Sequence, residues 1–75
     1  MKSITLVPWT EACGKLLNVT EKEGCITLNF GKFQVNLSLN ESIAIKKLLN
    51  DDLIGKYISI LRTDSPNDPI LLIML

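Results

Sequence analysis

The chain has 75 residues and is predicted to be a single domain over 1–75, with a small core, because so short a chain hides only about 60–65% of its extended surface. Hydrophobic residues make up 47% of it and charged residues 21%, a balance that excludes an intrinsically disordered chain. Eight basic residues cancel eight acidic ones, which removes the long-range positive field of a general nucleic-acid or anionic-membrane binder.

The first predicted strand is short, because Ile4 and Leu6 alternate with polar neighbours only as far as Pro8, which lacks the N–H that a sheet needs. A second strand is predicted over residues 15–20, where apolar and polar positions again alternate. The charged residues 21–24 (EKEG) follow as a turn that glycine closes.

Two interpretations fit the PWTEACG stretch that separates these strands. It is either a bend that joins two halves of one long first strand, or a short helical turn that Thr10 begins and Gly14 ends. Trp9, the only tryptophan, is interpreted as a plug or lid of the core, with a ligand or partner anchor as the alternative.

The clearest local signal is CITLNFGKFQVNLSL, residues 25–39. Two runs that alternate between apolar and polar residues flank Gly31 and Lys32, and a two-residue loop with glycine first predicts a β-hairpin with a turn of type II′. The register that puts all the apolar residues on one face pairs Phe30 with Phe33, Leu28 with Val35, and Ile26 with Leu37.

The NESIAIKKLLND stretch predicts one short helix over about residues 41–50. Asn40 is the expected N-cap, and Glu41 lies in the first turn, where the helix dipole favours a carboxylate. Lys46 and Lys47 are expected on the solvent side. The apolar stripe that would face the core is Ala44, Ile45, Leu48 and Leu49.

The last two predicted strands, residues 56–63 and 70–75, form a hairpin with the turn-rich DSPNDP segment as its loop. Ile58 and Ile60 share one face of the first of these strands, whereas Leu61 lies on the other. The final strand is apolar at every position, which predicts burial on both of its faces.

The element order strand, strand, strand, helix, strand, strand predicts a mainly β domain, and we expect a small five- to six-stranded barrel because closure removes exposed sheet edges. In this order the chain resembles the OB-fold, a Greek-key barrel with a helix between its third and fourth strands. An SH3-like barrel and an α+β sheet are the alternatives. The resemblance implies a ligand face on strands two and three, which we interpret here as solvated: Thr27, Asn29, Gln34, Asn36 and Ser38.

The chain is predicted not to be an enzyme, and no cofactor or metal is expected. It contains no histidine, and its glycines match neither a phosphate-binding nor a dinucleotide-binding loop. Cys13 and Cys25 are expected to be reduced, with Cys25 packed, because nothing in the sequence indicates an oxidising compartment. Neither cysteine has a recognisable activating base, and two lone cysteines make a poor metal site. Asp64 and Asp68 match no calcium-loop spacing.

The main functional hypothesis is a non-catalytic interaction or assembly module. The outward side chains of the final strand need a second cover, either the helix or another protein chain. We expect a homo-oligomer, or a complex with a protein partner, formed through the C-terminal hairpin. The candidate interface residues are Leu61, Leu71, Ile73 and Leu75.

The alternative is a nucleic-acid-binding module of OB or SH3-like type, which the zero net charge disfavours. Arg62, the only arginine, is expected to pair with Asp64 or Asp68 in its own loop. The candidate nucleic-acid residues are Trp9, Lys32, Lys46, Lys47, Lys56, Tyr57 and Arg62.

The expected location is the cytoplasm, away from membranes. Only five residues, Ser3 to Val7, separate Lys2 from Pro8. A signal peptide needs an apolar region of about 7–15 residues. The apolar run from Ile70 to Leu75 is likewise far shorter than the roughly 20 residues that cross a bilayer as a helix.

Overall fold

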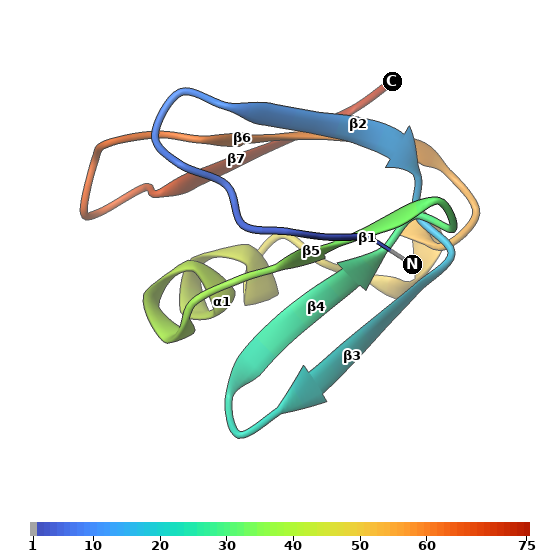
Figure 1. The fold of residues 1–75 in the computed structure, drawn as a ribbon, viewed down its shortest axis with the longest axis horizontal. Coiled ribbons are helices and arrows are strands. Elements are labelled where there is room, and N and C mark those ends of the chain that lie inside the picture. The colour runs from blue at the N-terminus through green and yellow to red at the C-terminus, as the bar shows by residue number, and fades with distance from the viewer. Residues whose placement is uncertain (1) are drawn as a thin grey trace.

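The computed structural model describes residues 2–75, which form seven strands in two sheets and one α-helix (Figure 1). The four-stranded sheet has the order β1-β5-β4-β3, with β1 (Lys2–Ile4), β5 (Phe33–Asn36), β4 (Cys25–Asn29) and β3 (Asn18–Lys22). The three-stranded sheet has the order β2-β6-β7, with β2 (Glu11–Lys15), β6 (Tyr57–Arg62) and β7 (Ile70–Met74). The mainly β prediction is confirmed, whereas a closed OB or SH3-like barrel stays a prediction.

The segment before the helix holds more strands than the sequence predicted. Residues 11–14 belong to β2, so the helical-turn interpretation of the PWTEACG stretch is wrong. The chain instead bends before β2, where the Thr10 N–H donates to the Val7 carbonyl oxygen at 3.1 Å. This bend carries the chain from β1 in one sheet to β2 in the other.

Leu16 and Leu17 join the two sheets, because the chain passes through them from β2 to β3. The Leu16 N–H donates to the Lys56 carbonyl oxygen at 2.9 Å, next to the three-stranded sheet. The Leu17 N–H donates to the Asn29 carbonyl oxygen of β4 at 2.8 Å. The strand predicted over residues 15–20 is therefore divided between two strands in different sheets.

β4 and β5 form the predicted hairpin in the predicted register. Leu28 lies opposite Val35, and the Phe30 N–H donates to the Phe33 carbonyl oxygen at 2.9 Å. The two phenylalanine rings stack with their centroids 4.9 Å apart. Gly31 opens the loop with a φ of 90°, in the region that a type II′ turn requires at this position and that favours glycine.

The helix α1 (Leu39–Lys46) begins and ends earlier than the predicted range of 41–50. Its N-cap is Ser38, not Asn40. The Ser38 hydroxyl accepts from the Glu41 N–H, and the Glu41 carboxylate accepts from the Ser38 N–H at 2.8 Å. This reciprocal capping needs a glutamate or glutamine three residues after the cap, which Ser38 has and Asn40 lacks.

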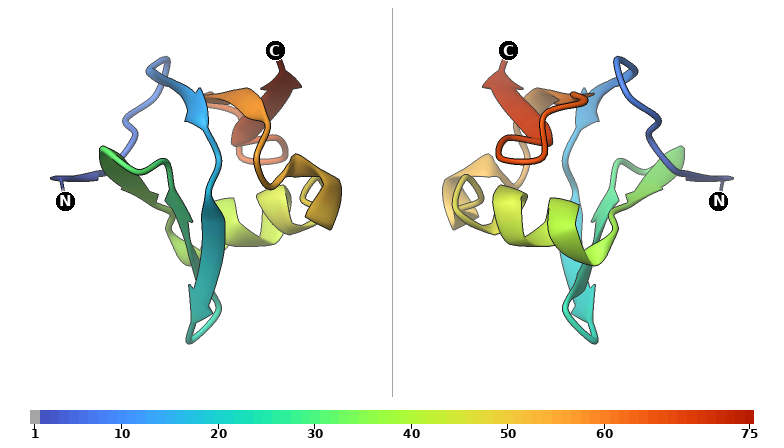
Figure 2. Two further views of the ribbon diagram at one scale, coloured as in Figure 1. Left: turned by 90° about the vertical axis from the view of Figure 1, so that its right-hand side faces the viewer. Right: turned by 90° about the vertical axis from the view of Figure 1, so that its left-hand side faces the viewer.

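α1 packs against β4 and β7 and lies beneath the three-stranded sheet (Figure 2). Ile45 of the predicted stripe is fully buried, and Leu49 packs against the core from the turn that follows the helix. Leu48 is exposed, and a short 3-10 helix, η1 (Asp51–Leu53), leads the chain towards β6. The buried core is Leu6, Ala12, Leu16, Ile26, Leu28, Phe30, Val35, Leu37, Ile45, Leu53, Ile58, Ile60 and Ile70.

The predicted pairing of Arg62 with Asp64 or Asp68 is wrong. The Arg62 guanidinium at the end of β6 donates to the Glu41 carboxylate in the first turn of α1. Glu41 is 3% exposed, whereas the Arg62 side chain is 25% exposed, so a buried carboxylate pairs with a partly exposed guanidinium between the helix and the three-stranded sheet. Arg62 lies in the same phase of β6 as the core residue Ile60, which turns its side chain towards the helix and away from the loop.

Ser42 ties the same turn of α1 to the four-stranded sheet. Its hydroxyl accepts a hydrogen bond from the Ile26 N–H of β4 at 2.8 Å and donates to the Ser38 carbonyl oxygen at 2.7 Å. Since Ser42 is 1% exposed, water does not compete for these bonds. The start of α1 is therefore fixed to both sheets.

Removing the partner of Glu41 should destabilise the fold. Arg62→Met is expected to lower the free energy of unfolding by about 3 kcal/mol, because it leaves a buried carboxylate without its counter-ion. Glu41→Gln in the same chain should recover part of this loss, since the amide oxygen still caps the helix and no charge is buried. Urea unfolding followed by circular dichroism measures both changes. A loss below about 1 kcal/mol in Arg62→Met would mean that water reaches the carboxylate.

Candidate protein interaction surface

The three-stranded sheet turns one face to the core and one face away from it. Side chains alternate between the two faces along each strand, and Ala12, Ile58 and Ile60 face the core. The opposite face is here called the outer face. Its side chains form three rows that run across the strands. The strand register sets these rows, together with a hydrogen bond from the Leu75 N–H to the Tyr57 carbonyl oxygen. The rows are Glu11, Leu61 and Leu71; Cys13, Ser59 and Ile73; and Lys15, Tyr57 and Leu75.

The β7 side of the outer face is apolar and exposed. Leu71, Ile73 and Leu75 are 45%, 57% and 69% exposed, and Tyr57 beside them is 61% exposed. Leu61 is partly buried. The four candidate interface residues from the sequence therefore share one surface. Tyr57, which the sequence assigned to the nucleic-acid set, also belongs to it.

The prediction that the final strand is buried on both faces is wrong. On the core side, Ile70 is 3% exposed and Leu72 is partly buried. α1 packs against this side of β7, so it cannot cover the side chains that point the other way. Of the two covers considered for these side chains, the helix is excluded.

A polar cluster lies at the centre of the outer face. Ser59 is 4% exposed, and its hydroxyl donates to Oε2 of Glu11 at 2.7 Å. The Cys13 thiol donates to the Ser59 hydroxyl with a distance of 3.4 Å between Sγ and Oγ. Glu11 was missed as a residue of this face because its segment was left undecided between bend and helix, and Lys15 was missed because it was assigned to a different strand, residues 15–20. The alternation of Glu11, Cys13 and Lys15 with two small residues was the available signal.

β7 is also an edge strand. The hydrogen bonds from the Leu75 N–H to Tyr57 and from the Thr63 N–H to Pro69 show that odd-numbered residues of this strand bond to β6. The backbone groups of its even-numbered residues, Ile70, Leu72 and Met74, therefore point to the free side. Among residues 2–75, no strand pairs there, and no charged residue of β7 guards this edge.

Both cysteines are free thiols and both are exposed. The prediction that Cys25 is packed is wrong, because Cys25 begins β4 in the phase opposite to the buried Ile26. Cys13 lies on the outer face and Cys25 on the four-stranded sheet, so the two thiols report on different surfaces.

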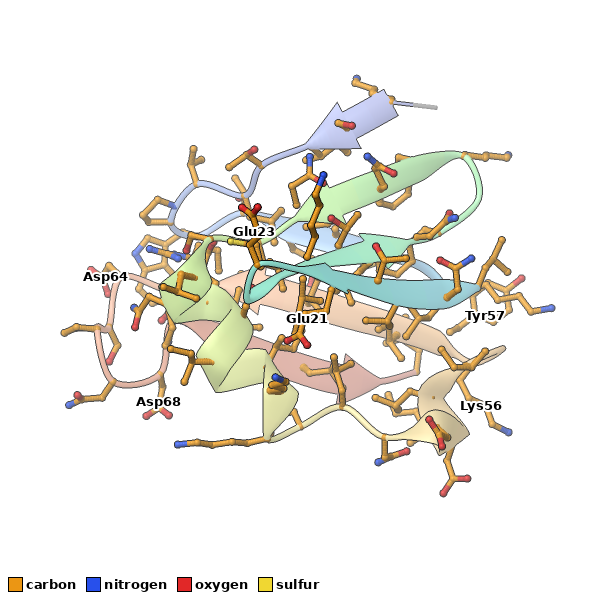
Figure 3. All side chains as sticks on the ribbon, turned by 90° about the horizontal axis from the view of Figure 1, so that it is seen from below. Glu21, Glu23, Lys56, Tyr57, Asp64 and Asp68 are labelled. Atoms are coloured by element: carbon orange, nitrogen blue, oxygen red, sulfur yellow. The ribbon has the colours of Figure 1, made fainter. Side chains whose placement is uncertain are left out.

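The candidate nucleic-acid residues come from several parts of the molecule. Lys46 forms an ion pair with Glu21 at 2.7 Å, and Arg62 is held by Glu41. Lys32 lies in the loop between β4 and β5, and Lys47 is the C-cap of α1. Lys56 and Tyr57 lie at one end of β6, opposite the loop that carries Asp64 and Asp68 (Figure 3).

Trp9 is 64% exposed, so its interpretation as a plug or lid of the core is wrong. Its backbone has a φ of 67°, in the left-handed region, and its N–H donates to the Arg62 carbonyl oxygen at 2.6 Å. Trp9 therefore lies beside one end of β6 and Tyr57 at the other end. These two aromatic rings do not form one stacking platform.

The polar face of β4 and β5 bonds mainly within the chain. Thr27 donates to the Asn36 side chain at 3.1 Å, and Gln34 donates to the Ser3 hydroxyl of β1 at 2.9 Å. Asn29 accepts from the Gly31 N–H at 2.8 Å, and Ser38 caps α1. Several side chains of this face, interpreted from the sequence as solvated, therefore bond within the chain.

An open pocket of about 390 Å³ lies between the start of β3 and the segment after α1. Asn50 at its rim accepts from the Asp52 N–H at 2.9 Å, so its side-chain oxygen is already engaged in the local turn. The lining residues are Leu17, Asn18, Val19, Leu49, Asn50, Asp51 and Ile54.

No family model matches the chain, and no curated protein or solved structure matches it either. Within residues 2–75, no helix has both the length and the apolar character needed to span a membrane. In the same residues, no three cysteine or acidic side chains gather to hold a metal ion.

The two buried serines should respond differently to removal of their hydroxyls. Ser59→Ala is expected to lower the free energy of unfolding by less than about 1 kcal/mol, because its partners Glu11 and Cys13 are exposed and can bond to water. Ser42→Ala is expected to cost about 1–3 kcal/mol, because it leaves the buried Ile26 N–H without an acceptor. Urea unfolding of both variants gives the comparison. An equal loss of unfolding free energy in the two variants would mean that water does not reach Glu11 and Cys13 on the outer face.

Proposed function

We propose that this chain is a non-catalytic interaction module that assembles with itself through the outer face and the adjoining edge of β7. The observation that carries the proposal is the exposure of Leu71, Ile73 and Leu75 beside Tyr57, on a strand whose edge is also open. A contiguous apolar surface of this kind marks an interaction site more often than a lone exposed leucine does.

The energetics favour a moderate, concentration-dependent association. Covering a half-exposed leucine or isoleucine contributes about 1 kcal/mol through the hydrophobic effect. The outer face offers four such apolar or aromatic side chains, of which Leu75 is the most exposed at 69%. Lost translational and rotational freedom offsets part of this gain, so association is expected at micromolar or higher concentrations.

The proposed module is a small β-barrel of OB or SH3-like form that acts in the cytoplasm. The passage of the chain from one sheet to the other at Leu16 and Leu17 supports the barrel form, since strands that bend between sheets are how a small barrel closes. The proposal includes no catalysis. The Ser59 hydroxyl donates to a carboxylate, and the sequence holds no histidine that could activate it.

The nucleic-acid alternative has less support. Two of its cations, Lys46 and Arg62, are neutralised by Glu21 and Glu41. A single-strand binder combines a basic groove with aromatic platforms, whereas Trp9 and Tyr57 lie at opposite ends of β6.

A charge placed on the outer face should separate the copies without unfolding them. Ile73→Lys is expected to weaken self-association by about tenfold or more, because a lysine would be buried against apolar side chains. Ile43→Lys on α1 is the matched control, since Ile43 is 55% exposed and Ile73 is 57% exposed, on different surfaces. Light scattering on a sizing column across a concentration series measures the mass, and circular dichroism checks the fold.

Two outcomes count against the proposal. One is a wild-type chain that stays monomeric throughout the concentration series. The other is equal behaviour of Ile73→Lys and Ile43→Lys, which would place any association elsewhere. Salt-sensitive binding of the wild-type chain to a single-stranded oligonucleotide, lost in Lys56→Glu, would favour the alternative.

A further inference from the structure

We infer that two copies pack outer face against outer face about a two-fold axis that runs across the strands and passes through the row of Cys13, Ser59 and Ile73. This inference rests on the proposed self-association and adds its geometry. The partner is a second copy of this chain, because the charges of the outer face are complementary to the same charges in reversed order.

Two charged residues of opposite sign lie at opposite ends of the outer face. Glu11 begins β2 and Lys15 ends it, and both are exposed. They lie four positions apart on one strand, which corresponds to about 13 Å. The ion pairs among residues 2–75 join Lys46 to Glu21 and Arg62 to Glu41, so neither Glu11 nor Lys15 has an ionic partner there.

A two-fold axis across the strands reverses their direction and lays each strand on its own copy. Glu11 then meets Lys15 of the second copy, and the same contact occurs twice by symmetry. The other side chains of these two rows meet apolar or aromatic groups. Leu71 faces Leu75, and Leu61 faces Tyr57. Every charged side chain of the outer face therefore meets its opposite, and every large apolar side chain meets another one.

The other face-to-face arrangement is much less favourable. An axis parallel to the strands would lay β2 of one copy on β7 of the other. Glu11 would then meet Leu71 and Lys15 would meet Leu75, which desolvates two charges in each copy without pairing them. Charge therefore favours the first of these two arrangements with aligned strands.

The middle row can be covered without leaving unpaired polar groups. Ser59 already donates to Oε2 of Glu11, and the Cys13 thiol already donates to Ser59. Oε1 of Glu11 stays free to receive the lysine of the second copy. Two sheets stacked in this way would lie about 10 Å apart, the normal spacing of a β-sandwich.

Charge exchange at Glu11 and Lys15 tests this geometry. Glu11→Lys and Lys15→Glu are each expected to weaken self-association by about tenfold or more, because two like-charged contacts replace two attractive ones. A mixture of the two variants should form a heterodimer close to wild-type strength. The double variant Glu11→Lys/Lys15→Glu should self-associate again. Circular dichroism confirms folding, and dilution series in analytical ultracentrifugation give the dissociation constants.

Thiol crosslinking tests the position of the axis independently. With Cys25→Ser, the remaining Cys13 should be joined to Cys13 of a second copy by a short bis-maleimide. With Cys13→Ser, the remaining Cys25 is also exposed but lies on the other sheet, and it should give no such product. Crosslinking through Cys25 alone would overturn the inference.

Edge pairing of β7 is the competing geometry, and Met74→Pro separates the two. The Met74 N–H points to the free edge, so proline there removes an edge donor while it leaves the outer face intact. Face packing predicts unchanged association. Loss of association in Met74→Pro, with no effect of the charge variants, would overturn the inference but keep the proposed function. A monomeric wild-type chain would overturn both.

Discussion

The buried carboxylate of Glu41 is the contact on which the arrangement of this small fold depends. Its two oxygens serve different elements, since one accepts from the Ser38 N–H at the start of α1 and the other from Arg62 of β6. Ser42, the next residue, holds β4. The helix is thereby fixed under the core side of the three-stranded sheet. The same contacts that complete the core leave the opposite side of β7 uncovered in the described chain.

Local patterns were enough to predict the two hairpins. Gly31 and the alternating runs on either side of it define the β4–β5 register, and the turn-rich DSPNDP segment separates β6 from β7. Partners distant in sequence could not be predicted in this way. Arg62 pairs with a carboxylate 21 residues away because its position in β6 turns its side chain towards the core. Which side of β6 faces the core depends on the packing of the whole sheet, and the local sequence does not define that packing.

The sequence predicted the β7 part of the candidate surface but not its β2 part. Leu71, Ile73 and Leu75 have the correct phase, but the sequence could not show that α1 would take the other side of the strand. β2 gave a weaker signal because its core-facing residues are small. A Cβ on Gly14 would lie 3.0 Å from the Phe30 ring, so the core admits no apolar side chain that would have marked this strand.

Apolar area alone would let two copies associate through the outer face without fixing their relative orientation. Leucine and isoleucine contacts tolerate many orientations, and an unguarded edge strand adds a further mode of association. In the proposed dimer, Glu11 and Lys15 contribute little net free energy, because a rim ion pair gains only slightly more than it loses in desolvation. Their role is to penalise the arrangement in which β2 of one copy lies on β7 of the other, because it leaves each charge against a leucine. The apolar residues then supply the affinity and the two charges supply the register.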